Sequence, residues 1–209
     1  MKRIALLLIV LPFLLAAANA QESRQDVSAS VTGIGHLDDP VAGDTNVQMT
    51  THKGMGALFS YRYMLTPRSA LEVNYQYLQN AIHYDTNPTG SSTYPGVYRV
   101  HTRIQEVSAA YVFNFNFRRW NPFLEVGGGG YFFTPIAAGT SLLDLKSKTS
   151  IGGLYGAGVS YEISPSFDVR LEYRGIFLKT PDFGSTTPNL STGKYYNLSN
   201  PVLGVAYHF

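Results

Sequence analysis

Charged side chains recur on one side of otherwise apolar, alternating stretches of this chain. The eight that stand out by type and spacing are Arg62, Glu72, Glu106, Glu125, Glu162, Arg170, Glu172 and Arg174. Paired carboxylates can perform general acid–base catalysis, and a row of acidic and basic side chains can line a path for ions. Buried charges with opposite partners can also simply fill an interior. Because each glutamate has a cationic neighbour and no substrate cleft is implied, a structural network is favoured over an ion path, and catalysis comes last.

The other residues with chemical potential form no recognised constellation. No histidine pair has metal-site spacing and cysteine is absent, so we predict no metal, no cofactor, no catalytic residue and no enzyme. His36, Asp38, Asp39 and Asp44 could bind a cation, although a solvated acidic loop is the simpler interpretation. The run Gly127–Gly130 lacks the Lys and Ser/Thr of a phosphate loop, so close packing of a sheet is favoured there.

The charged side chains belong to eight runs in which apolar and polar residues alternate, the pattern of β-strands with one apolar face. In one run, Leu71, Val73 and Tyr75 alternate with Glu72 and Asn74. The expected strands cover residues 26–35, 51–65, 70–85, 98–115, 122–134, 149–163, 168–179 and 195–209. Runs of this length can cross an outer membrane when tilted.

The connections between these runs alternate in length. Long stretches follow the first, third, fifth and seventh runs, whereas short turns such as 66–69 follow the others. Short periplasmic turns and long extracellular loops are typical of outer-membrane barrels. We therefore expect an all-β, eight-stranded antiparallel transmembrane barrel, an up-and-down meander. A three-residue first turn would place Arg62 opposite Glu72, and similar arithmetic would place Glu162 opposite Arg170.

Residues 1–20 have the features of a secretory signal peptide. Lys2 and Arg3 precede an apolar run, and residues 18–20 form an A-x-A cleavage site. Cleavage would leave residues 21–209 as one barrel domain with a net charge near zero, which argues against nucleic-acid binding. The absence of cysteine excludes disulfides and an N-terminal lipid anchor, while 15 Tyr and 12 Phe with only 14% charged residues fit a membrane barrel.

The last run ends in a second pattern. Gly204, Tyr207 and Phe209 resemble the C-terminal insertion signal of bacterial outer-membrane barrels, except that Val202 stands where that signal usually has a polar residue. The whole chain after residue 20 resembles the small eight-stranded outer-membrane barrels, the OmpA-type transmembrane domain and its single-domain relatives. The matching segments are Tyr61 to Tyr63, Leu71 to Tyr75, Pro122 to Gly130, Gly156 to Tyr161 and Gly204 to Phe209.

This resemblance implies the cell outer membrane of a Gram-negative-type bacterium, contact with outer-membrane lipid, and the barrel-assembly machinery and periplasmic chaperones as partners during insertion. For the role, we expect structural or surface interaction with a lumen filled by paired charges. A narrow porin or carrier for ions or small hydrophobic molecules, a lipid-modifying enzyme and a soluble periplasmic barrel are the alternatives. An interfacial aromatic girdle is expected from Tyr61, Tyr63, Tyr111, Phe113, Trp120, Tyr161, Tyr173, Tyr207 and Phe209.

Overall fold

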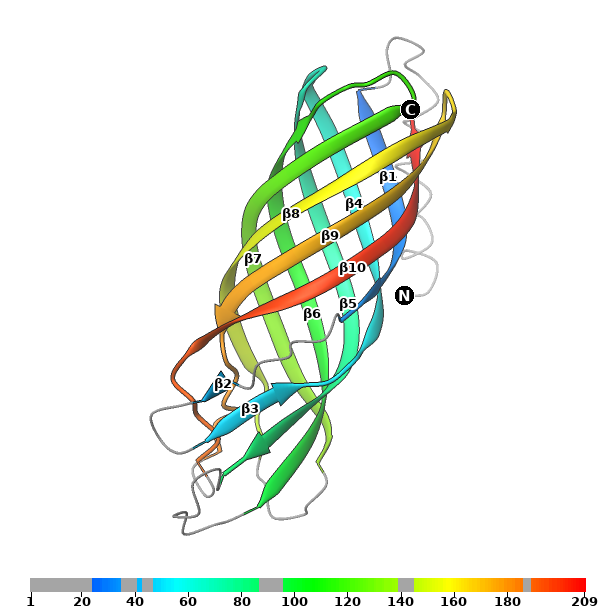
Figure 1. The fold of residues 1–209 in the computed structure, drawn as a ribbon. Helices are drawn as coiled ribbons and strands as arrows, with labels where there is room; N and C mark the ends of the chain where they lie inside the picture. The colour runs from blue at the N-terminus through cyan, green and yellow to red at the C-terminus, as the bar shows by residue number, and fades with distance from the viewer. Residues whose placement is uncertain (1–23, 35–40, 43–46, 87–95, 139–144, 186–188) are drawn as a thin grey trace, which may run out of the picture.

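The structure, a computed structural model, forms a closed antiparallel β-barrel (Figure 1). It describes residues 24–34, 41–42, 47–86, 96–138, 145–185 and 189–209. The expected signal peptide, residues 1–20, lies outside these ranges and stays a prediction. The described residues contain no helix of the length and apolarity needed to span a bilayer.

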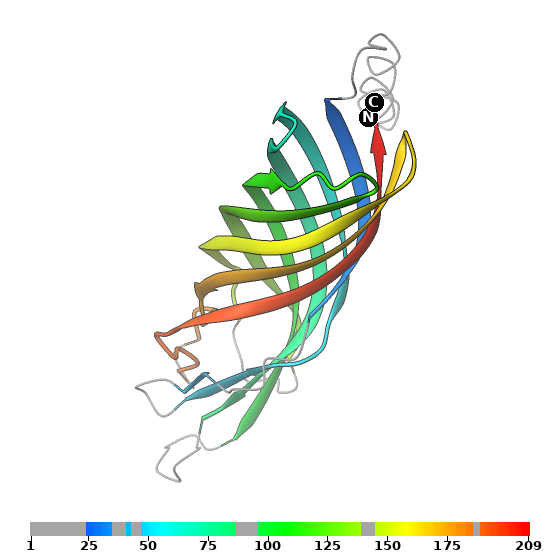
Figure 2. The same cartoon turned by 45° about the horizontal axis from the view of Figure 1, so that its top comes forward.

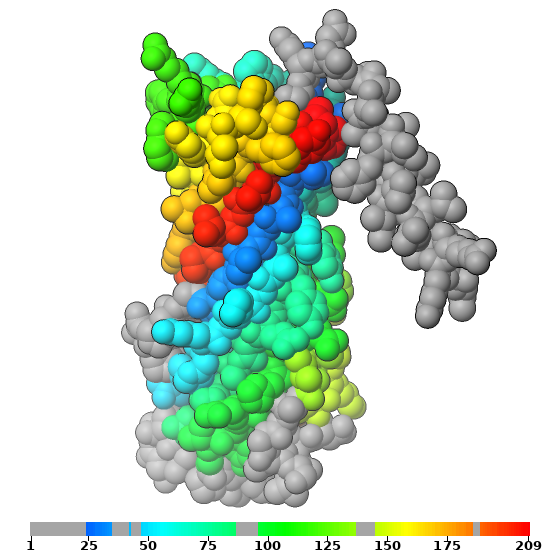
Figure 3. Space-filling model, turned by 90° about the vertical axis from the view of Figure 1, so that its right-hand side faces the viewer, coloured from blue at the N-terminus to red at the C-terminus, as the bar shows by residue number. Residues whose placement is uncertain are grey.

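Eight long strands make the barrel wall, and each pairs with the next one along the chain. They are β1 (Gln25–Gly33), β4 (Met55–Thr66), β5 (Ser69–Asp85), β6 (Val97–Asn114), β7 (Trp120–Ala138), β8 (Lys148–Ser164), β9 (Phe167–Lys179) and β10 (Tyr195–His208). The ring closes because β10 pairs with β1, from Asp26 opposite His208 to Thr32 opposite Val202. Figure 3 shows this seam, where the red and blue strands lie side by side on the outer surface. The predicted eight-stranded meander is confirmed.

Two further short strands lie between β1 and β4, in a stretch that the sequence analysis treated mostly as loop. They are β2 (Val41–Ala42) and β3 (Gln48–Thr51), and β3 pairs with the far end of β5, placing Met49 opposite Tyr84. Two- and four-residue strands are too short for an alternating pattern to be distinguished from loop. They extend the sheet beyond the wall at the end that carries the long connections.

The short and long connections lie at opposite ends of the barrel, as expected. Figure 2 shows the short turns at the same end as the C-terminus. Two of these turns are preceded by register shifts, between Met64 and Thr66 and between Glu162 and Ser164. In an outer-membrane barrel, the end with the short turns faces the periplasm.

The outside of the wall is apolar and the inside is polar in the half of the barrel near the short turns. Leu71, Val73 and Tyr75 are 41–53% exposed, whereas Glu72 and Asn74, between them on β5, are buried. A soluble barrel would show the reverse arrangement. This wall is suited to contact with lipid.

Aromatic side chains gather on the outer surface near the short turns. The rings of Trp120 and Tyr161 lie 4.8 Å apart, and those of Phe167 and Tyr207 lie 5.0 Å apart. Tyr173 lies opposite Pro201 and further along β9, so its assignment to this girdle stays a prediction. The strand alternation gave its face correctly, but its height on the wall depends on where the turn begins.

Candidate functional site in the barrel lumen

The two strands of the first hairpin place one tight ion pair in the lumen. Arg62 of β4 lies opposite Glu72 of β5, and its Nε and Nη2 atoms lie 2.7 and 2.6 Å from Glu72 Oε2. Both side chains are buried. When a guanidinium contacts a carboxylate through two nitrogens, the opposite charges attract and the orientation of the two side chains is fixed as well.

Arg174 of β9 is the centre of the lumen network, and its side chain is fully buried. Its Nη2 lies 2.9 Å from Glu106 Oε1 of β6, and its Nε lies 3.2 Å from Oε1 of both Glu125 of β7 and Glu172 of β9. Its Nη1 donates to Gln76 Oε1 of β5, at 3.4 Å. One guanidinium therefore links four strands and crosses the lumen.

Arg170, two inward positions nearer the short turn than Arg174, joins the network to the closing seam. Its Nη2 lies 3.2 Å from Asp26 Oδ1 of β1, and its Nη1 lies 3.7 Å from Glu72 Oε2. Its Nε donates to Ser160 Oγ at 3.3 Å. Asp26 was not among the predicted network residues, although its alternation with Val27 placed it on the inward face.

Glu162 does not lie in this network. It is exposed, and it lies opposite Asp168, whereas Ser160 lies opposite Arg170. The predicted pairing of Glu162 with Arg170 was wrong by two residues: this hairpin has the same register as the first one, in which the position equivalent to Arg62 is Ser160. The other seven predicted residues are all buried in the lumen: Arg62, Glu72, Glu106, Glu125, Arg170, Glu172 and Arg174.

The acids of the described network outnumber its cations. Three arginines, Arg62, Arg170 and Arg174, meet five carboxyl groups, those of Asp26, Glu72, Glu106, Glu125 and Glu172. Arg62 contacts one acid, Arg170 contacts two and Arg174 contacts three. Loss of Arg174 would therefore leave several buried acids without their nearest counter-charge.

Neutral groups complete the packing of the network. Ser108 Oγ donates to Glu106 Oε1 at 2.5 Å. Two guanidinium groups lie over the Phe123 ring, with Arg62 Cζ at 4.8 Å and Arg170 Cζ at 5.8 Å from its centroid. Cations over an aromatic face are stabilised by the ring quadrupole. Gly156 leaves room for Glu125, because a Cβ there would lie 2.5 Å from its Oε1.

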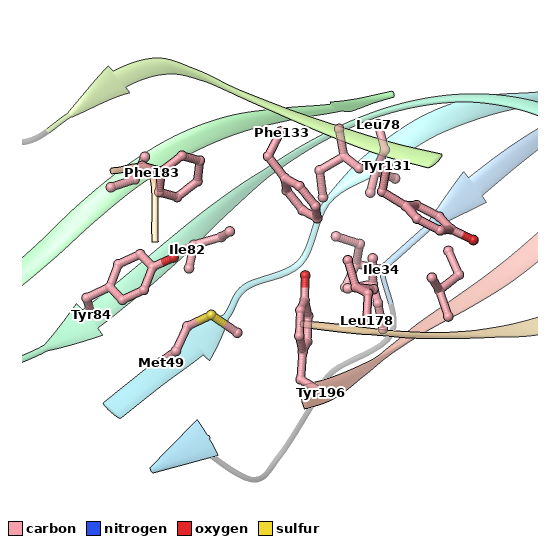
Figure 4. Packing of buried hydrophobic residues seen from close by; sticks show 14 of the residues in the cluster. Ile34, Met49, Leu78, Ile82, Tyr84, Tyr131, Phe133, Leu178, Phe183 and Tyr196 are labelled. Atoms are coloured by element: carbon pink, nitrogen blue, oxygen red, sulfur yellow. The ribbon is translucent and has the colours of Figure 1, made fainter. Parts of the chain in front are cut away.

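The half of the lumen near the long connections is apolar instead. Figure 4 shows side chains from several strands and loops packed in one cluster. Its labelled members are Ile34, Met49, Leu78, Ile82, Tyr84, Tyr131, Phe133, Leu178, Phe183 and Tyr196. The sequence analysis expected charges to fill the lumen and missed this cluster. The change from Gln76 to Leu78 among the inward positions of β5 was the available signal.

The connection between β9 and β10 covers this apolar half. Phe183 and Leu190 are fully buried in the cluster, and Tyr84 Oη donates to the Pro181 carbonyl at 2.6 Å. At the rim, Asp182 Oδ1 lies 3.2 Å from Lys148 Nζ. Although partial burial opposes ionisation, the Gly184 N–H and the Lys148 ammonium hold the pKa of Asp182 below its usual range.

A polar hollow of about 360 Å³ opens at the end with the short turns. Arg118, Arg119 and Glu162 line it, together with Asp168 and His208, whose Oδ2 and Nε2 atoms lie 2.9 Å apart. The nearby hydroxyl of Ser160 accepts from Arg170 and is thus part of the lumen network.

No group of three or more His, Asp or Glu side chains is arranged to hold a metal ion within the described ranges. The acidic stretch with His36, Asp38, Asp39 and Asp44 lies outside those ranges.

Comparison with known proteins gives a family and a fold. The family model described as "Outer membrane protein beta-barrel domain" matches residues 4–209. Neisserial surface protein A (NspA) is similar in structure, with a TM-score of 0.58 and 17% identity, over 90% of this chain and 98% of that chain. The outer membrane protein OprG from Pseudomonas aeruginosa gives a TM-score of 0.61 and 10% identity, over 90% and 96%. No curated protein matches the sequence.

Proposed function

This chain belongs to the outer membrane protein beta-barrel domain family, and on that premise we propose that it is a sealed barrel with a structural or surface-interaction role. The observation that carries the proposal is the position of Arg174. Its guanidinium contacts side chains of four strands across the lumen, so ions would have to displace paired, buried charges to pass. An eight-stranded barrel has an interior that side chains can fill.

The apolar cluster is a second barrier in series with the first. A hydrated ion would have to shed water to cross the region around Leu78, Phe133 and Leu178, all of them fully buried. The cost of moving a charge into apolar surroundings is very large. Both barriers therefore oppose conduction by different physical means.

Planar-bilayer recording of the refolded protein tests this proposal. We expect no steady single-channel current from the wild-type protein. Arg174→Ala removes the side chain that crosses the lumen, and Lys179→Ala on the outer surface is its matched control. Steady current from the wild-type barrel would overturn the sealed-barrel role and favour the narrow porin.

A carrier for small hydrophobic molecules is the second candidate, and the apolar half of the lumen favours it. Opening of the connection that holds Phe183 and Leu190 would expose apolar side chains from several strands. Uptake of a small apolar solute by proteoliposomes tests this candidate. Uptake that rises in Phe183→Ala and is absent from empty vesicles would support it.

A catalytic role is not proposed, and neither is a cofactor. The hydrolase-like residue types at the rim, Ser160, Asp168 and His208, are already engaged: the serine with Arg170, and the other two with each other. Lipase assays of the refolded barrel in mixed micelles test this point, and turnover that depends on Ser160 would contradict it.

Insertion into the membrane is proposed to depend on Gly204, Tyr207 and Phe209, read by the barrel-assembly machinery after periplasmic chaperones deliver the chain. The Tyr207 ring packs between Phe167 and Phe209, at centroid distances of 5.0 and 6.1 Å. We expect Phe209→Ser to reduce insertion in cells but not refolding in detergent, with Leu203→Ala as control.

Cleavage of the signal peptide before Gln21 is a separate expectation, and mass spectrometry of the mature chain would test it.

A further inference from the structure

The outer face of the β5–β6 hairpin changes chemistry along its length. From the middle of the wall toward the end with the long connections, the outward pairs are Tyr75–Val107, Tyr77–Gln105, Gln79–Arg103, Ala81–His101 and His83–Arg99. The face therefore passes from apolar and aromatic through amide to basic within a few pairs.

The connection that leads into β4 adds two basic residues beside this face. The rings of His52 and His83 lie 3.9 Å apart, and the His52 N–H donates to the Ala81 carbonyl at 2.9 Å. Lys53 follows in the chain and is exposed. We call this surface the basic stripe, which consists of His52, Lys53, His83, Arg99, His101 and Arg103.

The permanent charges of the basic stripe have no carboxylate partner within the part of the chain that the structure describes. Among the described residues, no ion pair joins Lys53, Arg99 or Arg103 to an acid. Asp85, opposite Val97, lies on the same face one pair further out, beyond the basic stripe. Because the stripe itself contains Lys53, Arg99 and Arg103 and no acid, its net charge is positive.

Two side-chain contacts hold the arginines without neutralising them. Arg99 Nε donates to His83 Nε2 at 2.6 Å, a hydrogen bond that needs a neutral imidazole as acceptor. Arg103 Cζ lies 5.7 Å from the centroid of the Tyr77 ring, and its Nε is buried without a hydrogen-bond partner among the described residues. The terminal Nη groups of both arginines are the donors that remain for an anion.

The level of the basic stripe matches that of lipid headgroups. Gln105 Nε2 donates to Tyr75 Oη at 2.9 Å and Gln79 Nε2 donates to Tyr77 Oη at 2.7 Å, so the tyrosine hydroxyls mark where the outer surface becomes polar. Tyrosine prefers the boundary between acyl chains and headgroups. The stripe begins directly beyond that boundary.

The opposite flank of the barrel differs in the partners of its cations. At the same end, β8, β9 and β10 present Ile151, 85% exposed, and the stacked rings of Phe177 and Tyr195, with centroids 5.3 Å apart. Lysines are exposed on that flank too, but Lys148 Nζ lies 3.2 Å from Asp182 Oδ1. The basic stripe differs in carrying two guanidinium groups, neither of which forms an ion pair with an acid among the described residues.

We propose that the basic stripe binds the phosphate groups of anionic lipid headgroups in the outer leaflet of the outer membrane. The guanidinium groups of Arg99 and Arg103 supply paired N–H donors that suit phosphate oxygens, and Lys53 adds a mobile charge. This proposal rests on the placement of the barrel in the outer membrane. It does not depend on whether the lumen is sealed.

Binding of bisphosphorylated lipid A to the refolded barrel in zwitterionic detergent, followed by native mass spectrometry, tests the proposal. Each surface cation contributes a factor of about five to such binding, so we expect Arg99→Gln/Arg103→Gln to weaken it at least about tenfold. Lys148→Gln/Lys179→Gln, at the same end but on the other flank, is the matched control and should change it less than about twofold. Zwitterionic phosphatidylcholine should show no difference between the variants.

Three results would overturn the proposal. They are unchanged lipid A binding in the arginine variant, an equal loss in the lysine control, and displacement of lipid A by inorganic phosphate at matched ionic strength, which would indicate a small-anion site. Lys53→Glu lies outside the strands and provides a second test if the arginine variant does not refold. Retained lipid A affinity in Lys53→Glu would then count against the basic stripe.

Discussion

The two halves of the lumen are built by the same strands from opposite chemistry. On β5 the inward positions Glu72 and Gln76 belong to the network of buried charges, whereas Leu78 and Tyr84 belong to the apolar cluster. The charged half is directional, because each group needs a partner at hydrogen-bond distance. The apolar half depends on excluded water and close packing, which are not directional. The comparison shows that one barrel can be filled in two ways with different tolerance to change.

The halves also differ in what can open. The charged half consists entirely of wall residues, so breaking it disturbs the ring. The apolar half includes Phe183 and Leu190, which a connection supplies. Connections can open locally at a lower free energy than the whole fold. Breaking the charged half should therefore cost more free energy than opening the apolar half.

Arg174→Met should have the largest effect. It leaves Glu106, Glu125 and Glu172 buried beside an apolar side chain, and breaking a buried ion pair costs about 3–5 kcal/mol. Urea titration of the refolded barrel in lipid vesicles measures the free energy of unfolding.

Lys179→Met, on the exposed face, is the control for this change and should have little effect. Adding Glu106→Gln and Glu125→Gln to Arg174→Met should recover part of the loss, because fewer charges remain uncompensated. If Arg174→Met unfolds at the wild-type urea concentration, the network contributes no stability and the contrast between the halves fails.

Phe183→Ala should have a smaller and more local effect. Truncation of a core phenylalanine costs about 3–5 kcal/mol, and we expect a loss of unfolding free energy below about 3 kcal/mol because the connection can open without the wall. Hydrogen exchange should rise in residues 180–185 but not in β9. Phe132→Ala, on the outer face, should leave exchange in that connection unchanged, and a loss of protection throughout the barrel would contradict the local character of this half.

Tyr84→Phe should have a modest effect, since it removes the hydrogen bond to the Pro181 carbonyl and leaves the ring in place. Hydrogen bonds of this kind contribute about 0.5–1.5 kcal/mol. The change should appear as faster exchange in residues 181–185. Equal exchange in the variant and the wild type would show that packing of Phe183 alone holds the connection.

Acidification should produce the smallest effect. The lowered pKa of Asp182 means that its pair with Lys148 contributes fully above the ordinary Asp pKa of about 4 and is lost as the pH falls through the lowered value. Hydrogen exchange in residues 180–185, corrected for the intrinsic pH dependence, should therefore increase below about pH 4. Asp182→Asn should lack this response, and a variant that retains it would assign the response to another group.

The sequence predicted the wall of this barrel well because lipid outside and polar groups inside impose a strict alternation. The Arg62–Glu72 register followed from the length of a short turn, since an antiparallel hairpin transmits its turn length to every pair. The same rule explains the failure at Glu162. The hairpin of β8 and β9 repeats the register of the first one, with Ser164 opposite Phe167 and Glu162 opposite Asp168, so the expected Glu162–Arg170 pair was offset by two residues.

The apolar half and the seam were harder to predict for a different reason. The inward positions of Leu78 and Tyr84 could be read, but the assumption that charges fill the whole lumen prevented it. The partner of Arg170 is Asp26, on a strand that meets it only through the closing seam. Contacts between side chains two strands apart depend on barrel curvature, which alternation does not encode.

The seam between β1 and β10 also determines the order of assembly. The hydrogen bond from Arg170 to Asp26 joins residues 144 positions apart, so it can form only after nearly the whole chain has been synthesised. Until then β1 has an unpaired edge, and such edges promote aggregation. β1 can therefore complete its pairing only when β10 is in place, and the Arg170–Asp26 hydrogen bond forms only in the closed ring.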